Sequence, residues 1–386
     1  MRPPLWDELG ITIPVFAFSH CRDVVAAVTN AGGVGVYGAA MASTSQIDQD
    51  LAWIERETRG RAYGVDLLMP ARYVGDESGH LDAERGATLV PEEHRRFLDE
   101  LMRRHDVPAG NGSARVADGP AVPGGTRYTA EEADEALDVV FRYRPKLLVS
   151  ALGTPPAHVM ARARDRGMLV GALAGKAAHA IAHQRAGVDL VIAQSYEAGG
   201  HTGEIGGLVL VPEVVDAVHP MPVLMAGGIG RGRQLAAALA LGAEGVWCGS
   251  LWLTTVESEV PPLLKSKLLA ASSGDTVRTR AFTGKPARFL RTPWSEAWDS
   301  PENPDPLPTP VHSRAIESYW RRIEHAADAP GARPDQGAGL LVSKPVGQVI
   351  GLLNKATSCR QVISELMEDC VAATARLTER LEEAGG

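Results

Sequence analysis

Short apolar runs alternate with longer amphipathic stretches along most of this 386-residue chain. The runs are rich in β-branched residues, and Ala-rich helical stretches follow most of them, which is typical of βα units in a parallel sheet. The expected strands are Val15–Ser19, Gly33–Tyr37, Tyr63–Leu68, Leu147–Leu152, Leu169–Ala174, Leu190–Ser195, Val223–Gly228 and Gly245–Ser250. Eight such units predict a closed (β/α)₈ TIM barrel, with an open doubly wound sheet as the alternative.

Several of the predicted helices stop at a glycine just before the next strand. The expected helices are Cys21–Ala31, Gln46–Glu57, Ala157–Arg166, Ala177–Ala186 and Gly232–Leu241. The glycines are Gly32, Gly167, Gly187 and Gly242. Glycine is favoured there because the residue that ends a helix often adopts a left-handed backbone.

Two regions lack this rhythm and set the expected domain boundaries. An insertion over about 69–142 separates the third and fourth strands, and its part from Pro108 to Thr126 is rich in Gly, Pro and Ala. A segment over 256–345, rich in Pro, Trp and Arg, predicts a smaller helical cap or lid. The sequence therefore predicts a barrel over 1–255, this cap, and a closing helical segment over 346–386. The closing helix, about Cys359–Ala384, carries an apolar stripe of Val362, Leu366, Cys370, Ala373, Leu377 and Leu381.

Composition narrows the range of partners. The formal charge of −8 and the absence of a basic stripe argue against nucleic acid. Four scattered cysteines without metal-like spacing predict reduced thiols of a cytoplasmic protein. No apolar run is long enough to cross a membrane, and no signal peptide opens the sequence. We therefore expect an enzyme acting on a small molecule, with no nucleic-acid or membrane partner.

Two glycine-rich stretches follow the seventh and eighth expected strands. The first contains Gly227 and Gly228, and the second contains Gly249 and Ser250. In a βα barrel the active site lies at the carboxyl ends of the strands, and phosphate commonly sits beside these last two loops. Because glycine lets backbone N–H groups approach an anion closely, the pair predicts a phosphate site rather than simple tight turns.

Four other side chains are expected at the same end of the barrel. His20 follows the first strand, and His201 follows the sixth strand after Gly199 and Gly200. Asp66 lies in an apolar strand, where we expect it to face a ligand or a hydrogen-bond donor. His179 opens the helix after the fifth strand, and an imidazole there suits proton abstraction near neutral pH. His183 follows one helical turn later, but no third ligand accompanies the pair, so no metal site is expected.

Taken together, the motifs resemble the nitronate monooxygenase family, formerly called 2-nitropropane dioxygenases, which also contains FMN-dependent enoyl-ACP reductases. The matching pieces are Ile13–Phe16, Asn30–Gly35, Tyr63–Asp66, Glu197–His201, Met225–Ile229, Ala236–Ala243, Gly249–Ser250 and Gly347–Gly351. The resemblance implies an FMN-binding TIM barrel with a small second domain over the flavin. It places His179 where the nitronate oxygenases of the family have their base.

The resemblance also implies the remaining site residues. Flavin contacts are expected from Ala17, Phe18, Ser19, Asp66, Gln194, Gly199, Gly200, Gly227, Gly228, Gly249 and Ser250, and substrate contacts from His20 and His201. Three positions depart from the family. Ala17–His20 replaces a Gln-Gly-Gly-Met loop, Asp66 replaces an Asn that bonds the flavin ring, and Ser250 replaces a Thr.

Two enzymatic hypotheses follow from this resemblance. The first is oxidation of alkyl nitronates by O₂ to a carbonyl compound and nitrite, with His179 as base where a nitroalkane is accepted. The alternative is an NAD(P)H-dependent FMN reductase acting on an enoyl or other acyl-CoA or acyl-carrier thioester. Its phosphate contacts would come from Arg278, Arg280, Arg288 and Arg291. A flavin-binding regulatory protein is the third option, and the sequence leaves a homodimer open.

Overall fold

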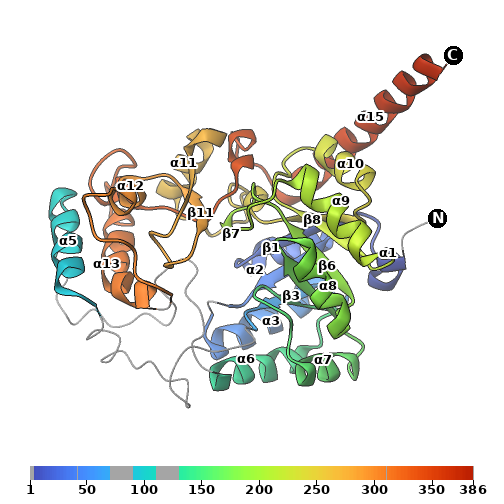
Figure 1. Cartoon of the computed structure of the whole chain (residues 1–386), viewed down its shortest axis with the longest axis horizontal. Helices are drawn as coiled ribbons and strands as arrows, with labels where there is room; N and C mark the ends of the chain where they lie inside the picture. The colour runs from blue at the N-terminus through green and yellow to red at the C-terminus, as the bar shows by residue number, and fades with distance from the viewer. Residues whose placement is uncertain (1–3, 41, 70–89, 110–129, 310, 386) are drawn as a thin grey trace.

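The computed structural model describes residues 4–40, 42–69, 90–109, 130–309 and 311–385. Its centre is a closed barrel of parallel strands in the order β1-β2-β3-β4-β5-β6-β8-β9 (Figure 1). These strands are β1 (Val15–Ser19), β2 (Val34–Gly38), β3 (Gly64–Leu67), β4 (Leu147–Ser150), β5 (Leu169–Ala174), β6 (Leu190–Gln194), β8 (Val223–Ala226) and β9 (Gly245–Cys248). The predicted TIM barrel is confirmed, and the doubly wound alternative is wrong because β9 pairs with β1 and closes the sheet.

Helices surround this barrel on the outside. They are α1 (Pro4–Leu9), α2 (Arg22–Asn30), α3 (Thr44–Thr58), α6 (Ala130–Tyr143), α7 (Ala157–Arg164), α8 (Ala177–Ala186), α9 (Gly207–Val218) and α10 (Gly232–Ala240). The glycines expected to end helices all have positive φ, for example 87° at Gly187 and 91° at Gly242. The predicted helix ends are therefore confirmed by the backbone itself.

Side chains alternate between the two faces of each barrel strand. Phe16, Val149 and Leu224 are fully buried in the core inside the barrel. Strand residues that point to the opposite face, such as Val65 and Leu148, lie in the outer core beneath the helices. This alternation decides which residues near the strand ends point toward the barrel mouth.

The region after the barrel forms the cap, which meets the barrel at β7, in the loop after β6 (Figure 1). Its helices are α11 (Pro262–Ala270), α12 (Pro293–Asp299), α13 (Val311–Ala327) and α14 (Ala338–Leu341). The structure adds a small antiparallel sheet to the expected helical cap. Its strands are β10 (Thr276–Thr279), β11 (Ala287–Leu290) and β7 (Gly200–His201), so the cap is joined to the loop after β6.

The expected insertion between β3 and β4 contributes one helix to the barrel and another that packs against the cap. Its last part is the barrel helix α6, which packs on α3. Its other described helix, α5 (Glu92–Arg104), lies beside α13 of the cap (Figure 1). There Tyr319 donates to Asp99 at 3.1 Å, and the ring of Phe97 meets Trp298 edge-on at 4.7 Å. Most of the Gly/Pro-rich stretch Pro108–Thr126 lies outside the described residues.

Aromatic side chains form the centre of the cap. Phe282 stacks on Phe289 with ring centroids 3.9 Å apart, and the edge of Trp320 meets Phe282 at 5.2 Å. All three rings are fully buried. Since large aromatic rings bury much apolar area, this cluster stabilises the cap, and it is continuous with the core between the barrel strands and their outer helices.

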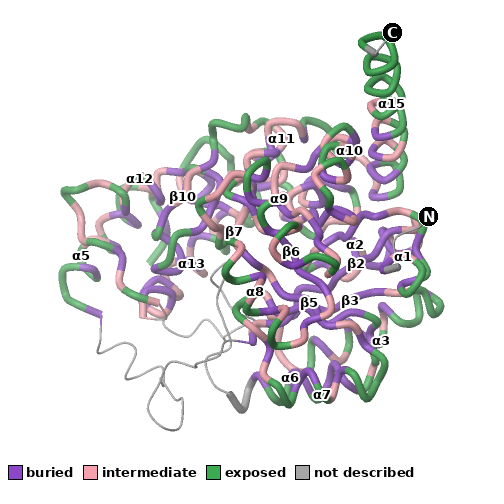
Figure 2. The backbone as a smooth tube through the Cα atoms, turned by 45° about the vertical axis from the view of Figure 1, so that its right-hand side comes forward, coloured by how far each residue is buried: buried purple, intermediate pink, exposed green. Residues whose placement is uncertain are grey.

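The closing helix α15 (Cys359–Gly385) begins on the barrel and then leaves it (Figures 1 and 2). Its first half packs on α10, and Leu366 and Cys370 are buried there. Leu377 and Leu381 are 53% and 64% exposed. The apolar stripe is therefore buried up to Cys370 and exposed at Leu377 and Leu381, because the helix outruns the surface on which it packs. Among the described residues, no helix is long and apolar enough to span a membrane.

Candidate active site

The carboxyl ends of the barrel strands form a mouth beneath the cap. Phe16 faces the inside of the barrel, and Phe18 follows two residues later in the same inner core. By the same alternation Asp66 and Gln194 face inward at the ends of β3 and β6, because Val65 and Val191 belong to the outer layers. Phe18 also stacks on Trp247 with centroids 6.0 Å apart and lies next to Gly249. The structure thus brings the expected Phe18, Asp66, Gln194 and Gly249 together.

Asp66 is an aspartate with no described partner. It is 2% exposed, and no described residue forms an ion pair or side-chain hydrogen bond with it. Burial holds the pKa of the Asp66 carboxyl well above the usual range for an aspartate. A buried carboxylate without a partner is costly, so burial favours the neutral carboxylic acid, which can donate one hydrogen bond.

Two other residues expected to touch the flavin are engaged elsewhere through their side chains. Ala17 lies in the outer core, away from the barrel interior. The hydroxyl of Ser19 accepts a hydrogen bond from the Cys21 N–H at 3.1 Å. A contact from Ala17 to a bound ring would therefore come from its backbone.

The two glycine loops lie side by side because β8 pairs with β9. Gly227 and Gly228 have φ values of 100° and 73°, and a side chain at Gly227 would collide with the hydroxyl of Ser195. Among the described residues, none accepts a hydrogen bond from the N–H groups of Gly227, Gly228 or Gly249. The Ser250 hydroxyl accepts from the Gly347 N–H at 2.8 Å, which leaves its own proton free to donate. Unsatisfied donors gathered in this way suit the oxygens of a phosphate.

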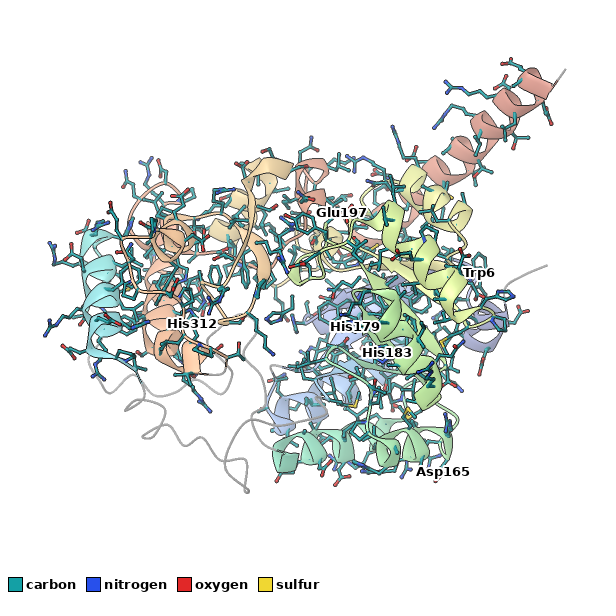
Figure 3. All side chains as sticks on the ribbon, in the orientation of Figure 1. Trp6, Asp165, His179, His183, Glu197 and His312 are labelled. Atoms are coloured by element: carbon teal, nitrogen blue, oxygen red, sulfur yellow. The ribbon has the colours of Figure 1, made fainter. Side chains whose placement is uncertain are left out.

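The loop after β6 is fixed by partners that the sequence did not identify. The Glu197 carboxylate accepts from the Gly207 N–H, with both oxygens at 3.1 Å, and thereby caps the first turn of α9 (Figure 3). The buried Arg288 donates to the Tyr196 carbonyl from Nη2 at 3.0 Å and from Nε at 3.3 Å. A Cβ at Gly199 would lie 2.8 Å from the Gly347 nitrogen, so only glycine fits there. The only sequence signal for these roles was the Glu-Ala-Gly-Gly-His motif itself.

His201 is held in one tautomer by its neighbours. Its Nε2 lies 2.9 Å from the hydroxyl of Thr283, and that hydroxyl donates to the Lys285 carbonyl at 3.1 Å. Because the Thr283 proton is already used, Nε2 carries a proton and Nδ1 is a bare acceptor. Burial lowers the pKa of His201 to about 4, so the ring is neutral at neutral pH. The residue is nevertheless exposed to solvent at the mouth.

His20 is a second neutral imidazole at the mouth. Its Nδ1 lies 2.7 Å from the Gly38 carbonyl, which accepts only if Nδ1 is protonated. Burial, and to a smaller extent the charge of Lys344, lowers the pKa of His20. The ring meets Phe18 edge-on at 5.1 Å, so Phe18 and His20 form one wall.

His179 differs from these two because it makes no side-chain hydrogen bond to any described residue. It is exposed in the first turn of α8, at the end of that helix nearer the cap (Figure 3). Partial burial and the neighbouring Lys176 lower its pKa. In this eight-stranded ring, β5 lies opposite β1, so His179 and His20 stand on opposite sides of the mouth.

His183 has a structural role. It is buried, with Nδ1 2.9 Å from the Thr154 hydroxyl and Nε2 3.1 Å from the Leu173 carbonyl. With both ring nitrogens occupied, it offers no lone pair to a metal beside His179. In the described ranges, the one group of three potential ligands close together is Cys21, Asp23 and Glu259, which includes neither histidine.

The arginines that could bind a carrier phosphate are mostly engaged within the protein. Arg278 reaches Glu204 at 3.4 Å, and Arg280 donates to the carbonyls of Gly284 and Pro306. Arg288 holds Tyr196, as described above. Arg291 is exposed. The structure therefore gives three of these four residues a role that needs no thioester ligand.

Comparisons with known proteins agree with this architecture. Over residues 2–369 the chain matches the family model described as nitronate monooxygenase. The barrel, the paired glycine loops and this match define the class: the protein is a flavin-dependent TIM-barrel oxidoreductase. Within that class, the chain belongs to the nitronate monooxygenase family.

Individual relatives cover nearly the whole chain. The Mycobacterium tuberculosis protein named "Putative monooxygenase Rv1533" is 50% identical over 377 residues, 98% of each chain. A "Probable nitronate monooxygenase" of Staphylococcus haemolyticus is 30% identical over 90% of this chain and 95% of its own. Among solved structures, the nitroalkane oxidase of Streptomyces ansochromogenes aligns with a TM-score of 0.76 and 28% identity over 97% of this chain and 99% of its own. FabK of Thermotoga maritima, at 24% identity, covers 98% and 99% with a TM-score of 0.68 and shares the fold.

Proposed function

We propose that this protein oxidises alkyl nitronates with O₂ to a carbonyl compound and nitrite, using FMN as its flavin. His179 acts as the base when the substrate is the neutral nitroalkane. The observation that carries the proposal is the free imidazole of His179 at the mouth. Because its pKa is lowered, the neutral, proton-accepting form predominates at neutral pH.

The residues present fit a flavin mononucleotide. The unsatisfied N–H groups of Gly227, Gly228 and Gly249, with the Ser250 hydroxyl, would hold its phosphate. Phe18, Gln194 and the Gly199–Gly200 turn would border the ring, and neutral Asp66 would donate a hydrogen bond to it. When bound, the flavin supplies two-electron oxidation of the substrate and reaction with O₂.

The chain's own groups supply proton transfer and orientation. His179 takes the proton from the carbon that bears the nitro group, and it has no described partner to release first. His20 and His201 are neutral imidazoles whose free ring nitrogens accept hydrogen bonds, so they add polar contacts on their side of the mouth. The apolar walls, including Phe18, keep water from the reacting carbon.

The base is tested with His179→Asn and with His158→Asn as a matched control. His158 is an exposed histidine on α7, with 62% of its side chain accessible. We expect His179→Asn to slow nitrite release from nitroethane about 10²- to 10⁴-fold, because a general base typically contributes that much. Turnover of pre-formed ethyl nitronate should fall far less, since its proton is already gone.

Two results would contradict the proposal. Full activity of His179→Asn on nitroethane would remove His179 as the base. Absence of nitronate turnover by the wild type above that of free FMN would remove the reaction. In that case, rapid anaerobic reduction of the flavin by NADPH would favour the thioester reductase instead.

Several further expectations stay predictions. They are use of NAD(P)H, a homodimer and a cytoplasmic location. The division into a barrel over 1–255, a cap over 256–345 and a closing segment over 346–386 is also a proposal. The contact between α5 and α13 supports adding α5 to the cap.

A further inference from the structure

The segment between α14 and the 3₁₀ turn Gln348–Leu352 crosses from the cap back to the barrel. It runs as an extra edge beside β11: the Leu290 N–H donates to the Lys344 carbonyl at 3.1 Å, and the Val346 N–H donates to the Arg288 carbonyl at 3.2 Å. The Ser343 hydroxyl donates to the Leu290 carbonyl at 2.7 Å. The backbone around Lys344 is therefore held against β11 before and after this residue.

Lys344 stands apart from the other half-buried lysines. Lys265 donates to the carbonyls of Thr255 and Ser258, and Lys267 donates to three carbonyls around Gly339. Within the described ranges, the Lys344 ammonium has neither a hydrogen-bond acceptor nor a carboxylate within ion-pair distance. A partly buried cation left without a partner calls for an anion.

The surroundings of Lys344 place that cation over the barrel mouth. The next residue, Pro345, lies 4.0 Å from where a side chain at Gly200 would begin, so it borders the expected flavin loop. The charge of Lys344 contributes to lowering the pKa of His20 at the mouth and, on α13, that of Glu324, so the ammonium lies near both groups. Among the described residues, no ion pair joins Lys344 to Glu324, whose carboxylate accepts from Trp320 Nε1 at 2.9 Å and whose pKa burial raises to about 7.

The neighbouring imidazole adds no positive charge. His20 uses its Nδ1 proton on the Gly38 carbonyl, so the nitrogen left over is an acceptor. His201 likewise presents an acceptor. Lys344 is thus a half-buried cation near His20, without a described ion-pair partner, that can donate to the oxygens of a bound anion, while His179 stands across the mouth.

We propose that Lys344 binds the negatively charged oxygens of the substrate, so that the site selects the nitronate anion over its neutral nitroalkane. This inference rests on the proposed function for the identity of the anion. A nitronate spreads its charge over two oxygens, and an ammonium favours that form over the uncharged nitro group. The same cation could instead serve the negative charge of a reduced flavin ring, and the experiment separates the two.

The test compares the flavin-loaded wild type with Lys344→Met, Lys344→Arg and Lys146→Met. Lys146 is the matched control because it is an exposed lysine that directly precedes β4, at the end of the barrel away from the mouth, and its removal changes the net charge equally. Nitrite is the probe, and its binding is followed by the change that it causes in the flavin absorption spectrum. We expect Lys344→Met to weaken nitrite binding and raise the KM for ethyl nitronate about 10- to 100-fold, as for loss of a charged hydrogen bond. Changes in kcat and in the KM for nitroethane should stay within about 3-fold, Lys344→Arg should recover part of the affinity, and Lys146→Met should match the wild type.

Two outcomes would overturn the proposal. One is nitrite binding by Lys344→Met that is unchanged or no weaker than in Lys146→Met. The other is a shifted flavin midpoint potential in Lys344→Met with unchanged nitrite affinity, which would assign Lys344 to the flavin. Because nitrite binding needs no turnover, this result stands even if the wild type oxidises no nitronate.

A second measurement covers the case in which Lys344→Met loses its flavin. Reductive methylation of the wild type is followed at Lys344 by peptide mass spectrometry, with and without nitrite. Nitrite should slow modification of Lys344 and leave Lys146 unaffected. Equal rates at Lys344 with and without nitrite would also contradict the proposal.

Discussion

At the scale of single residues, Asp66 is the side chain whose environment departs furthest from that of an ordinary aspartate. It is buried at the end of β3, and the described residues offer it no cation. The neutral acid that results keeps the hydrogen-bond donor that an asparagine would have, while adding a group that can ionise. This reconciles an acidic residue with a position where the family commonly has an amide.

Asp66 makes stability depend on pH. Because the folded-state pKa lies above the unfolded value of 3.8, the folded protein keeps a proton that the unfolded chain loses. The contribution is fully present below about pH 3.8 and declines by up to about 1.4 kcal/mol per pH unit as the pH rises toward the folded pKa. We expect Asp66→Asn to be more stable than the wild type at pH 8, by a margin that is larger than at pH 5.

Differential scanning calorimetry at both pH values measures this effect. The matched control is Asp165→Asn, an exposed aspartate at the end of α7 (Figure 3). It should leave the pH dependence unchanged. An identical pH dependence in the wild type and Asp66→Asn would mean that the carboxyl is ionised in the folded protein.

Arg288 acts on the site through the loop that it holds. It is buried, donates twice to the Tyr196 carbonyl, and lies 4.5 Å from the Tyr196 ring centroid. We expect Arg288→Met to raise the dissociation constant of FMN about 10- to 100-fold, since hydrogen bonds from a charged donor are lost. Flavin fluorescence titration measures this constant.

Arg280 provides the control for that prediction. It also donates to two carbonyls, but within the cap rather than to the flavin loop. Arg280→Met should bind FMN within about 3-fold of the wild type. If both variants lose FMN equally, the effect belongs to cap folding and not to the loop after β6.

At the scale of elements, α15 divides into a packed half and a free half. Leu366 is 2% exposed against α10, while Leu381 is 64% exposed. We expect truncation after Cys370 to change the unfolding free energy by less than about 1 kcal/mol, because exposed side chains contribute little. Leu366→Ala should cost about 2–5 kcal/mol through the cavity that it leaves.

Urea unfolding of the two variants tests this division. A large loss on truncation would mean that residues beyond Cys370 pack on something, and a second copy of the chain would then be the first candidate. A negligible loss for Leu366→Ala would mean that the first half of α15 is not anchored on α10.

At the scale of the whole molecule, the site forms where three distant parts of the chain meet. The barrel supplies Asp66 and the glycine loops, the loop after β6 supplies His201, and the returning segment supplies Lys344. Glu197 links the loop after β6 to the returning segment. Its carboxylate caps α9, and its carbonyl accepts from the Gln348 N–H. The candidate active site is therefore shared between the barrel and the cap.

The sequence determined the parts of this protein that depend on local patterns. Alternating apolar runs set the eight strands, because side-chain parity is built into a strand. Glycines set the helix ends and the phosphate loops, because only glycine adopts those backbone angles without strain. The motif around His179 set its place in the first turn of α8.

Only the tertiary structure decided the rest, because it depends on contacts between segments far apart in the chain. No local pattern shows that α5 packs on α13, that Gly200–His201 pairs with β11, or that the α15 stripe outruns its surface. The tautomers of His20 and His201 follow from the Gly38 carbonyl and the Thr283 hydroxyl, and the isolation of Lys344 follows from what surrounds it. The sequence identifies these side chains. The neighbours that folding brings to them decide which are charged and which of their atoms remain without a hydrogen-bond partner.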